Sequence, residues 1–168
     1  MKEYVWLFPV LFIFHDMEEI IGFMIWYQKN KDLLDKKYPA ISRTYENAST
    51  EGFAFAVFEE LILCILICIF SINANWYGLW LGGFIACALH FVIHIIQSLV
   101  IKKYIPALAT SILALPFSIR IISNSLKILK YSIPTIFIYS ILGTVIIAIN
   151  IKFAHTLMHK FTIWQRNS

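Results

Sequence analysis

Three short stretches of the sequence carry side chains that can bind a metal ion or move a proton. Each lies inside an apolar run, and the three comprise His15-Asp16-Met17-Glu18-Glu19, Glu59-Glu60, and His90 with His94. Imidazole nitrogens and carboxylate oxygens suit zinc, iron and manganese, and two such ligands four residues apart on a helix converge on one ion. His15 and Glu19 have this spacing, and so do His90 and His94. The pattern therefore predicts a metal site shared by several helices.

These residues divide into predicted ligands and predicted catalytic groups. The predicted metal ligands are His15, Glu19, Glu59, His90 and His94. Glu18 and Glu60 are the predicted catalytic residues, because a spare carboxylate beside a metal can act as a general base. Asp16 is expected either to bind the metal itself or to support the ligands by hydrogen bonding, and Gln97 is expected to support them by hydrogen bonding. Zinc is the favoured ion, iron and manganese are alternatives, and the carboxylates would also allow two bridged metals.

The composition is that of a polytopic membrane protein rather than of an ordinary globular domain. Of the 168 residues, 60% are hydrophobic and only 14% are charged, and the mean hydropathy is +0.73. A charged acid at the centre of a membrane helix costs about 2.5 to 3.5 kcal/mol, so the acids need a metal, a proton or a partner helix to neutralise them. The net charge of +4 does not indicate nucleic-acid binding, because the cations lie in loops beside apolar runs.

The apolar runs predict one membrane domain, residues 1–168, with about five transmembrane helices in an all-α bundle. The spans cover about 4–27, 51–71, 76–101, 106–122 and 133–151. Pro39 interrupts the polar stretch after the first span, and the amphipathic stretch 123–132 is expected at the membrane interface. His155 and His159 follow the last span, in a polar tail, and are expected to be solvated.

The distribution of lysine and arginine predicts the orientation in the membrane. Five spans place the first long loop and the C-terminus on one side, where ten of the 14 cationic side chains lie; the other side holds four. Cytoplasmic loops are enriched in lysine and arginine. We therefore expect a protein of the plasma membrane with its N-terminus outside and its C-terminus in the cytoplasm.

The acidic and histidine side chains are expected to share one depth in the membrane. With a rise of about 1.5 Å per residue, they lie about 10 to 18 Å from the cytoplasmic ends of their spans. Gly22, Gly52 and Gly83 accompany them on the same helix faces. Small residues let helices approach closely in lipid, so these three faces are predicted to meet one another.

The three polar stretches together resemble the signature of a known family. They read His15-Asp16-Met17-Glu18-Glu19, then Phe55-Ala56-Val57-Phe58-Glu59-Glu60, then His90-Phe91-Val92-Ile93-His94-Ile95-Ile96-Gln97. In order and in placement on apolar helices they are similar to the HXXEE-domain family of small, multi-spanning membrane proteins. The resemblance covers about the first hundred residues. It implies that these residues belong together, and it brings no activity and no metal with it.

Three classes of function fit these residues. The first is a metal-dependent membrane enzyme acting on a lipid-like or membrane-embedded substrate, with hydrolysis favoured and oxidation at a two-metal site second. The second is a proton or metal-ion carrier that uses the same acids and histidines as a relay. The third is a structural subunit of a membrane assembly. Metal content and its response to substitution separate the three.

Overall fold

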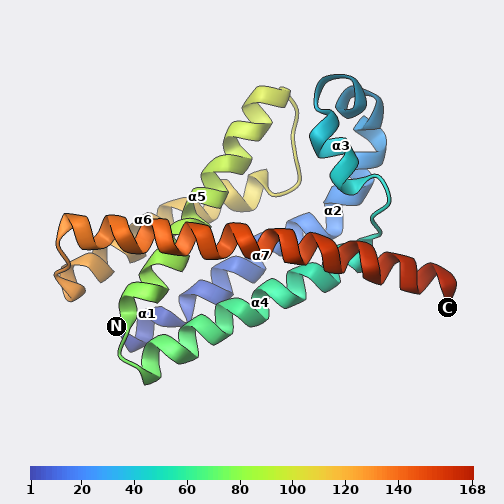
Figure 1. The fold of residues 1–168 in the computed structure, drawn as a ribbon. Helices are drawn as coiled ribbons and strands as arrows, with labels where there is room; N and C mark the ends of the chain where they lie inside the picture. The colour runs from blue at the N-terminus through green and yellow to red at the C-terminus, as the bar shows by residue number, and fades with distance from the viewer.

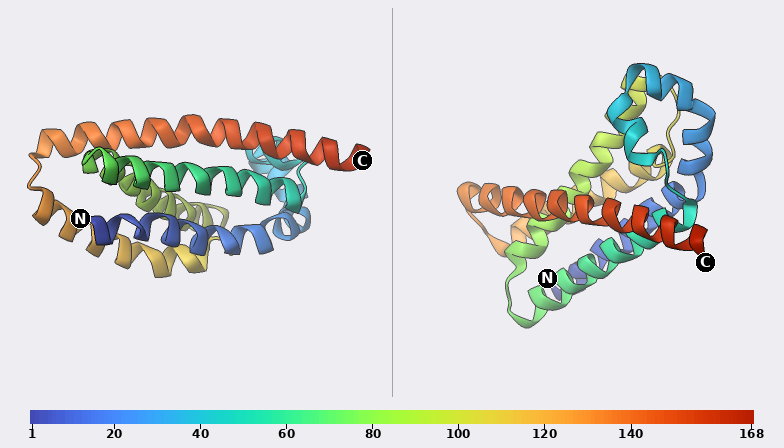
Figure 2. Two further views of the ribbon diagram at one scale, coloured as in Figure 1. Left: turned by 90° about the horizontal axis from the view of Figure 1, so that it is seen from below. Right: turned by 45° about the vertical axis from the view of Figure 1, so that its right-hand side comes forward.

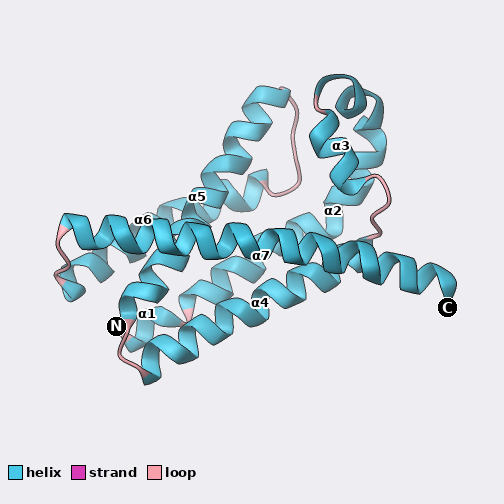
Figure 3. Ribbon diagram, in the orientation of Figure 1, coloured by secondary structure: helices cyan, strands magenta, loops and turns pink.

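Every regular element of the protein is a helix. A computed structural model describes residues 1–168 and contains no strand, so the expected all-α fold is confirmed (Figures 1 and 3). The helices are α1 (Lys2–Val5), α2 (Leu7–Lys37), α3 (Pro39–Tyr45), α4 (Thr50–Asn73), α5 (Tyr77–Ile101), α6 (Leu108–Leu129) and α7 (Ile133–Asn167).

Four of these helices, α4 to α7, are long and apolar enough to cross a membrane. The 31-residue helix α2 is also long enough, but Asp16, Glu18 and Glu19 interrupt its apolar part, so it is not among the four. Large apolar side chains point outward from the bundle; Ile133 is 82% exposed and Leu99 is 71% exposed. Such an outer surface belongs in lipid.

The long helices form a row that one helix crosses. In the left view of Figure 2 the row runs α7, α4, α2, α6, and each neighbouring pair is in contact. Helix α5 passes across this row and contacts α4, α6 and α7. Gly82 of α5 meets Gly143 of α7, where a Cβ atom added to Gly143 would lie 2.6 Å from the backbone nitrogen of Gly83. The crossing therefore depends on glycine, because any side chain would push the two backbones apart.

Two apolar clusters lie on either side of the polar residues. One contains Phe8, Cys64 and Trp80; the other contains Phe23 and Phe53. Along α2 and along α4, the acidic residues fall between the parts of the helix that enter the two clusters. The polar side chains therefore occupy a layer inside the bundle, with packed apolar residues above and below.

The first helices differ from the expected boundaries. Helix α2 continues ten residues beyond the expected end at residue 27 and stops at Lys37. Tyr38 breaks the helix, and Pro39 opens α3 in its first turn, a position where the missing N–H costs nothing. Tyr27 donates a hydrogen bond of 3.1 Å to the carbonyl oxygen of Ser42, which holds α3 back against α2.

The last two helices are also longer than expected. The stretch 123–129 is not a separate interfacial segment but the end of α6, because Ser111, Ser118 and Ser125 recur every seven residues and are fully buried. The expected polar tail after residue 151 is the second half of α7. There Ala154 and Met158 are buried at a spacing of four, so this half packs on α4.

Candidate metal centre

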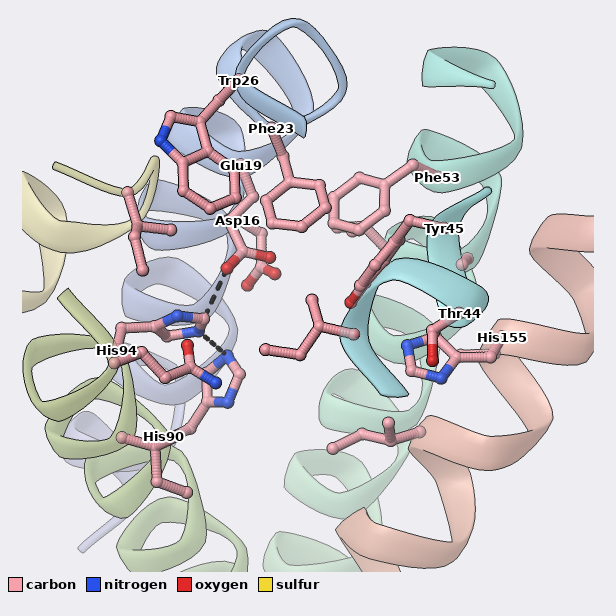
Figure 4. A pocket seen from close by; sticks show the side chains of 18 of the residues that line it. Asp16, Glu19, Phe23, Trp26, Thr44, Tyr45, Phe53, His90, His94 and His155 are labelled. Atoms are coloured by element: carbon pink, nitrogen blue, oxygen red, sulfur yellow. Dashed lines mark hydrogen bonds and ion pairs between the residues drawn. The ribbon is translucent and has the colours of Figure 1, made fainter. Parts of the chain in front are cut away.

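Two helices bring four of the predicted ligands together. His15 and Glu19 lie one turn apart on α2, and His90 and His94 lie one turn apart on α5. One ligand atom from each residue can be chosen so that all four atoms lie within 4.8 Å of one another. Figure 4 shows Glu19 above His94, and His94 beside His90. The group is enclosed, because His15 is fully buried and Glu19 and His94 are each 8% exposed.

The spacing of the ligand atoms fits one metal ion. Nε2 of His94 lies 3.0 Å from Oε1 of Glu19 and 2.8 Å from Nε2 of His90. The ring centroid of His15 lies 5.3 Å from that of His90 and 5.1 Å from that of His94. Metal–ligand bonds of about 2.0 to 2.2 Å place neighbouring ligands of a tetrahedral ion about 3.3 Å apart. The two ligand-atom separations at His94 are a few tenths of an ångström shorter than this value, and all four ligand atoms lie within 4.8 Å of one another.

Two ring nitrogens of this group have no hydrogen-bond partner in the protein. Nε2 of His15 is buried and unpaired, and so is Nδ1 of His94. A buried polar atom without a partner costs about 1 to 3 kcal/mol. The other ring nitrogen of His15, Nδ1, lies 3.1 Å from the hydroxyl of Thr110 on α6. Within the His15 ring only Nε2 is therefore free for an ion, and a divalent cation at the centre of the group would satisfy it.

Glu18, a predicted catalytic residue, lies outside this group. Its carboxylate faces the start of α6, where Oε2 accepts hydrogen bonds from the backbone N–H of Thr110 at 2.8 Å and from its hydroxyl at 2.6 Å. Oε1 accepts from the hydroxyl of Tyr104 and, at 3.4 Å, from the backbone N–H of Ala109. Neighbours on a helix point about 100° apart, so Glu18 turns to α6 when Glu19 turns to α5.

Glu59 and Glu60 also separate. The predicted ligand Glu59 accepts a hydrogen bond of 3.1 Å from the side-chain amide of Asn150 on α7 and is not part of the four-residue group. Its neighbour Glu60, the other predicted catalytic residue, lines a cavity that adjoins His90 and His94. The turn of α4 that places Glu60 in this cavity directs Glu59 toward α7.

The cavity has a volume of about 460 Å³ and lies between α2, α3, α4, α5 and α7. Its polar part is formed by Asp16, Glu19, Glu60, His90, His94 and Gln97. Its other walls are mainly apolar and include the aromatic rings of Phe23, Trp26, Tyr45 and Phe53 (Figure 4). Asp16 is 3% exposed, and its Oδ2 atom has no hydrogen-bond partner. A volume of this size is typical of ligand sites.

Several lining residues were not predicted from the sequence. Tyr45 reaches the cavity from α3, and burial together with the carboxyls of Glu19 and Glu60 raises the pKa of its hydroxyl, which therefore stays a neutral donor. His155 was expected to be solvated, but it is half-buried and lines the far side of the cavity, its ring 5.8 Å from that of Tyr45. The four-residue spacing of Ala154 and Met158 is the signal that could have extended α7 to this point.

Comparison with known proteins gives one match. A family model described as "Protein of unknown function with HXXEE motif" matches residues 6–121, which include the four-residue group, Glu18 and Thr110. No curated protein and no solved structure matches the chain.

Proposed function

The chain belongs to the HXXEE family, and we propose that it is a membrane metalloenzyme in which His15, Glu19, His90 and His94 hold a divalent metal ion beside a cavity for a lipid-like substrate. The observation that carries the proposal is the convergence of these four side chains from two helices, with His15, Glu19 and His94 buried and His90 half-buried. Three imidazoles and one carboxylate suit zinc best, and iron or manganese next.

Hydrolysis is the reaction that we propose first. A metal in this position supplies a Lewis acid that polarises a carbonyl or phosphoryl oxygen and lowers the pKa of water. Glu60 and Tyr45 line the same cavity. We assign to Glu60 the removal of a proton from the attacking water, and to the hydroxyl of Tyr45 a hydrogen bond to the substrate. Because Glu18 and Glu59 are held by α6 and α7, neither is assigned a part in the chemistry.

The apolar walls of the cavity support a lipid-like substrate. Phe23, Trp26 and Phe53 offer aromatic surface to a hydrocarbon chain, while the polar part of the cavity would receive the ester or phosphate end. The outer face of the bundle is itself apolar, so such a molecule would reach the protein from the bilayer.

We also propose that the N-terminus lies outside the cell and the C-terminus in the cytoplasm. The ammonium group of Lys103 donates a hydrogen bond of 2.6 Å to Asn30, so the cationic end of α2 and the cationic turn after α5 lie at one end of the bundle. The hydroxyl oxygens of Ser49, which precedes α4, and of Thr162, near the end of α7, lie 3.1 Å apart. The start of α4 and the C-terminal end of α7 therefore lie side by side. Concentrated lysine and arginine favour the cytoplasmic side.

Metal analysis of the protein purified in detergent tests the centre. We expect about one zinc, iron or manganese ion per chain, and loss of this ion when His90 or His94 is replaced by alanine. His159→Ala is the matched control, because His159 lies on α7 outside the group. A wild-type protein that binds none of these metals after incubation with them contradicts the proposal.

Hydrolysis of a long-chain nitrophenyl ester and of phospholipid vesicles tests the enzyme. We expect metal-dependent turnover that Glu60→Gln abolishes without loss of metal. Two other outcomes assign another function. If the metal stabilises the protein but no turnover is found, the site is structural, as metal sites with four protein ligands often are. Metal or proton flux into vesicles makes the protein a carrier, a role favoured by Asp16 and Glu60 in the cavity.

A further inference from the structure

The hydroxyl of Thr110, which connects His15 to α6, has a single proton to donate. The hydroxyl oxygen of Thr110 lies 2.6 Å from Oε2 of Glu18 and 3.1 Å from Nδ1 of His15. The other oxygens within reach are the backbone carbonyls of Ala107 at 3.3 Å and His15 at 3.4 Å. A threonine hydroxyl has one hydrogen and two lone pairs, so it can donate to only one of these neighbours.

Glu18 is the neighbour that receives this hydrogen. Its carboxylate accepts two backbone N–H groups at the first turn of α6, where the helix dipole favours a negative charge, and it accepts the hydroxyl of Tyr104 as well. An ionised carboxylate is an acceptor only. At 2.6 Å the contact with Thr110 is the shortest that the hydroxyl makes, as expected for a hydrogen bond to a charged acceptor.

The hydroxyl of Thr110 can then only accept from His15. Its lone pair faces Nδ1, so Nδ1 of His15 carries the proton of the neutral ring. The hydroxyl of Ser111 lies farther from Nδ1, at 3.5 Å, and can accept from the same N–H group. The lone pair of the ring is left on Nε2, the buried nitrogen that has no hydrogen-bond partner and belongs to the ring that packs against His90 and His94. A metal-binding histidine commonly has this arrangement, with its second nitrogen donating to an outer partner.

We infer that Glu18 and Thr110 are positioning residues that set the tautomer of His15 and aim the lone pair of Nε2 into the group of His90, His94 and Glu19. The fourth residue of the His-x-x-Glu-Glu motif thus acts through a threonine of another helix, and the fifth acts directly. The tautomer does not depend on a metal, whereas the expected effect on metal affinity rests on the proposed function.

The tautomer is measured in metal-free protein labelled with ¹⁵N in its histidine rings, using long-range proton–nitrogen correlation spectra assigned with His15→Gln. We expect the Nδ1–H form at His15 in the wild type and in Thr110→Ser, which keeps the hydroxyl. Thr110→Val removes the acceptor, and we expect the ring to lose its preference for this form. Thr156→Val is the matched control, because Thr156 is exposed on α7 and its hydroxyl donates to its own helix.

The same variants are titrated with zinc. We expect Thr110→Val to bind zinc about 10- to 100-fold more weakly than the wild type, and Thr110→Ser to restore the affinity. An Nε2–H ring in the wild type overturns the inference, and so does an unchanged spectrum in Thr110→Val. If Thr110→Val does not fold, Glu18→Gln decides, because its amide can donate to Thr110 and should move the ring proton to Nε2. A wild type with the expected tautomer but no zinc binding refutes the proposed function and leaves the inference standing.

Discussion

Glu18 and Glu19 are neighbours in the chain, but their carboxylates are bound by different helices. Oε1 of Glu19 lies 3.0 Å from Nε2 of His94 on α5, whereas Oε2 of Glu18 accepts two hydrogen bonds from Thr110 on α6. A single turn of α2 thus contacts both helices with side chains of the same type. The two glutamates have the same chemistry, and the fold gives them different partners.

Replacing each of these glutamates by glutamine should separate the roles. We expect Glu19→Gln to lose the metal, because a neutral amide is a poor substitute for a carboxylate ligand. Glu18→Gln should still bind about one ion, more weakly, and should lower the stability by about 0.5 to 2 kcal/mol, as expected when a helix N-terminus loses its capping carboxylate. Metal content and thermal unfolding in detergent measure both effects. Equal loss of metal in the two variants would show that Glu18 is itself a ligand.

Substitution of Glu59 gives a second test of which carboxylates are needed for metal binding and turnover. Its only hydrogen bond to another side chain is with Asn150, and a glutamine in its place can make the same bond. We expect Glu59→Gln to keep the metal content and the turnover of the wild type. Glu60→Gln, at the next position, is the matched comparison, because it should abolish turnover without loss of metal. A protein that loses its metal on Glu59→Gln would place this side chain among the ligands, against the arrangement described above.

If the cavity binds a lipid-like molecule, a larger side chain in its wall should block this binding without removing the metal. Ala56 lines the cavity and is 5% exposed. A phenylalanine there would fill part of the 460 Å³ available, so we expect Ala56→Phe to weaken the binding of a fluorescent long-chain fatty acid at least tenfold while metal content stays unchanged. Ala148→Phe on the exposed face of α7 is the control and should bind the probe normally. Equal binding by both variants would rule out this cavity as the lipid site.

The crossing of α5 and α7 predicts that the stability of the protein depends on Gly143, which lies outside the four-residue group. A Cβ atom on Gly143 would overlap the backbone of α5, so we expect Gly143→Val to destabilise the protein by about 1 to 3 kcal/mol, as overpacking does. Ala148→Val adds the same kind of side chain to an exposed position of α7 and should have little effect. Thermal unfolding compares the two. Similar melting temperatures for both variants would mean that α5 and α7 do not approach each other as closely at Gly82 and Gly143 as the structure shows.

The residues of the four-residue group were largely predictable, but their partners were not. The spacing of His15 with Glu19 and of His90 with His94 is a property of each helix alone, and it led to the group that the structure assembles. Nothing in the sequence marks Thr110 as the partner of Glu18. Nor does any local pattern bring Tyr45 and His155, which are 110 positions apart, side by side in the wall of one cavity.

The amino-acid sequence by itself determined the class of the protein, the helices that carry the polar residues, and the pairs of candidate ligands one turn apart. These properties follow from hydropathy and from the 3.6-residue period, which act within a single helix. Only the tertiary structure decided which of two adjacent glutamates joins the histidines of α5. That choice depends on how each helix is rotated about its own axis, and the rotation is set by all the contacts of the bundle together, including the approach of Gly82 and Gly143 and the packing of α6 against α2 and α5.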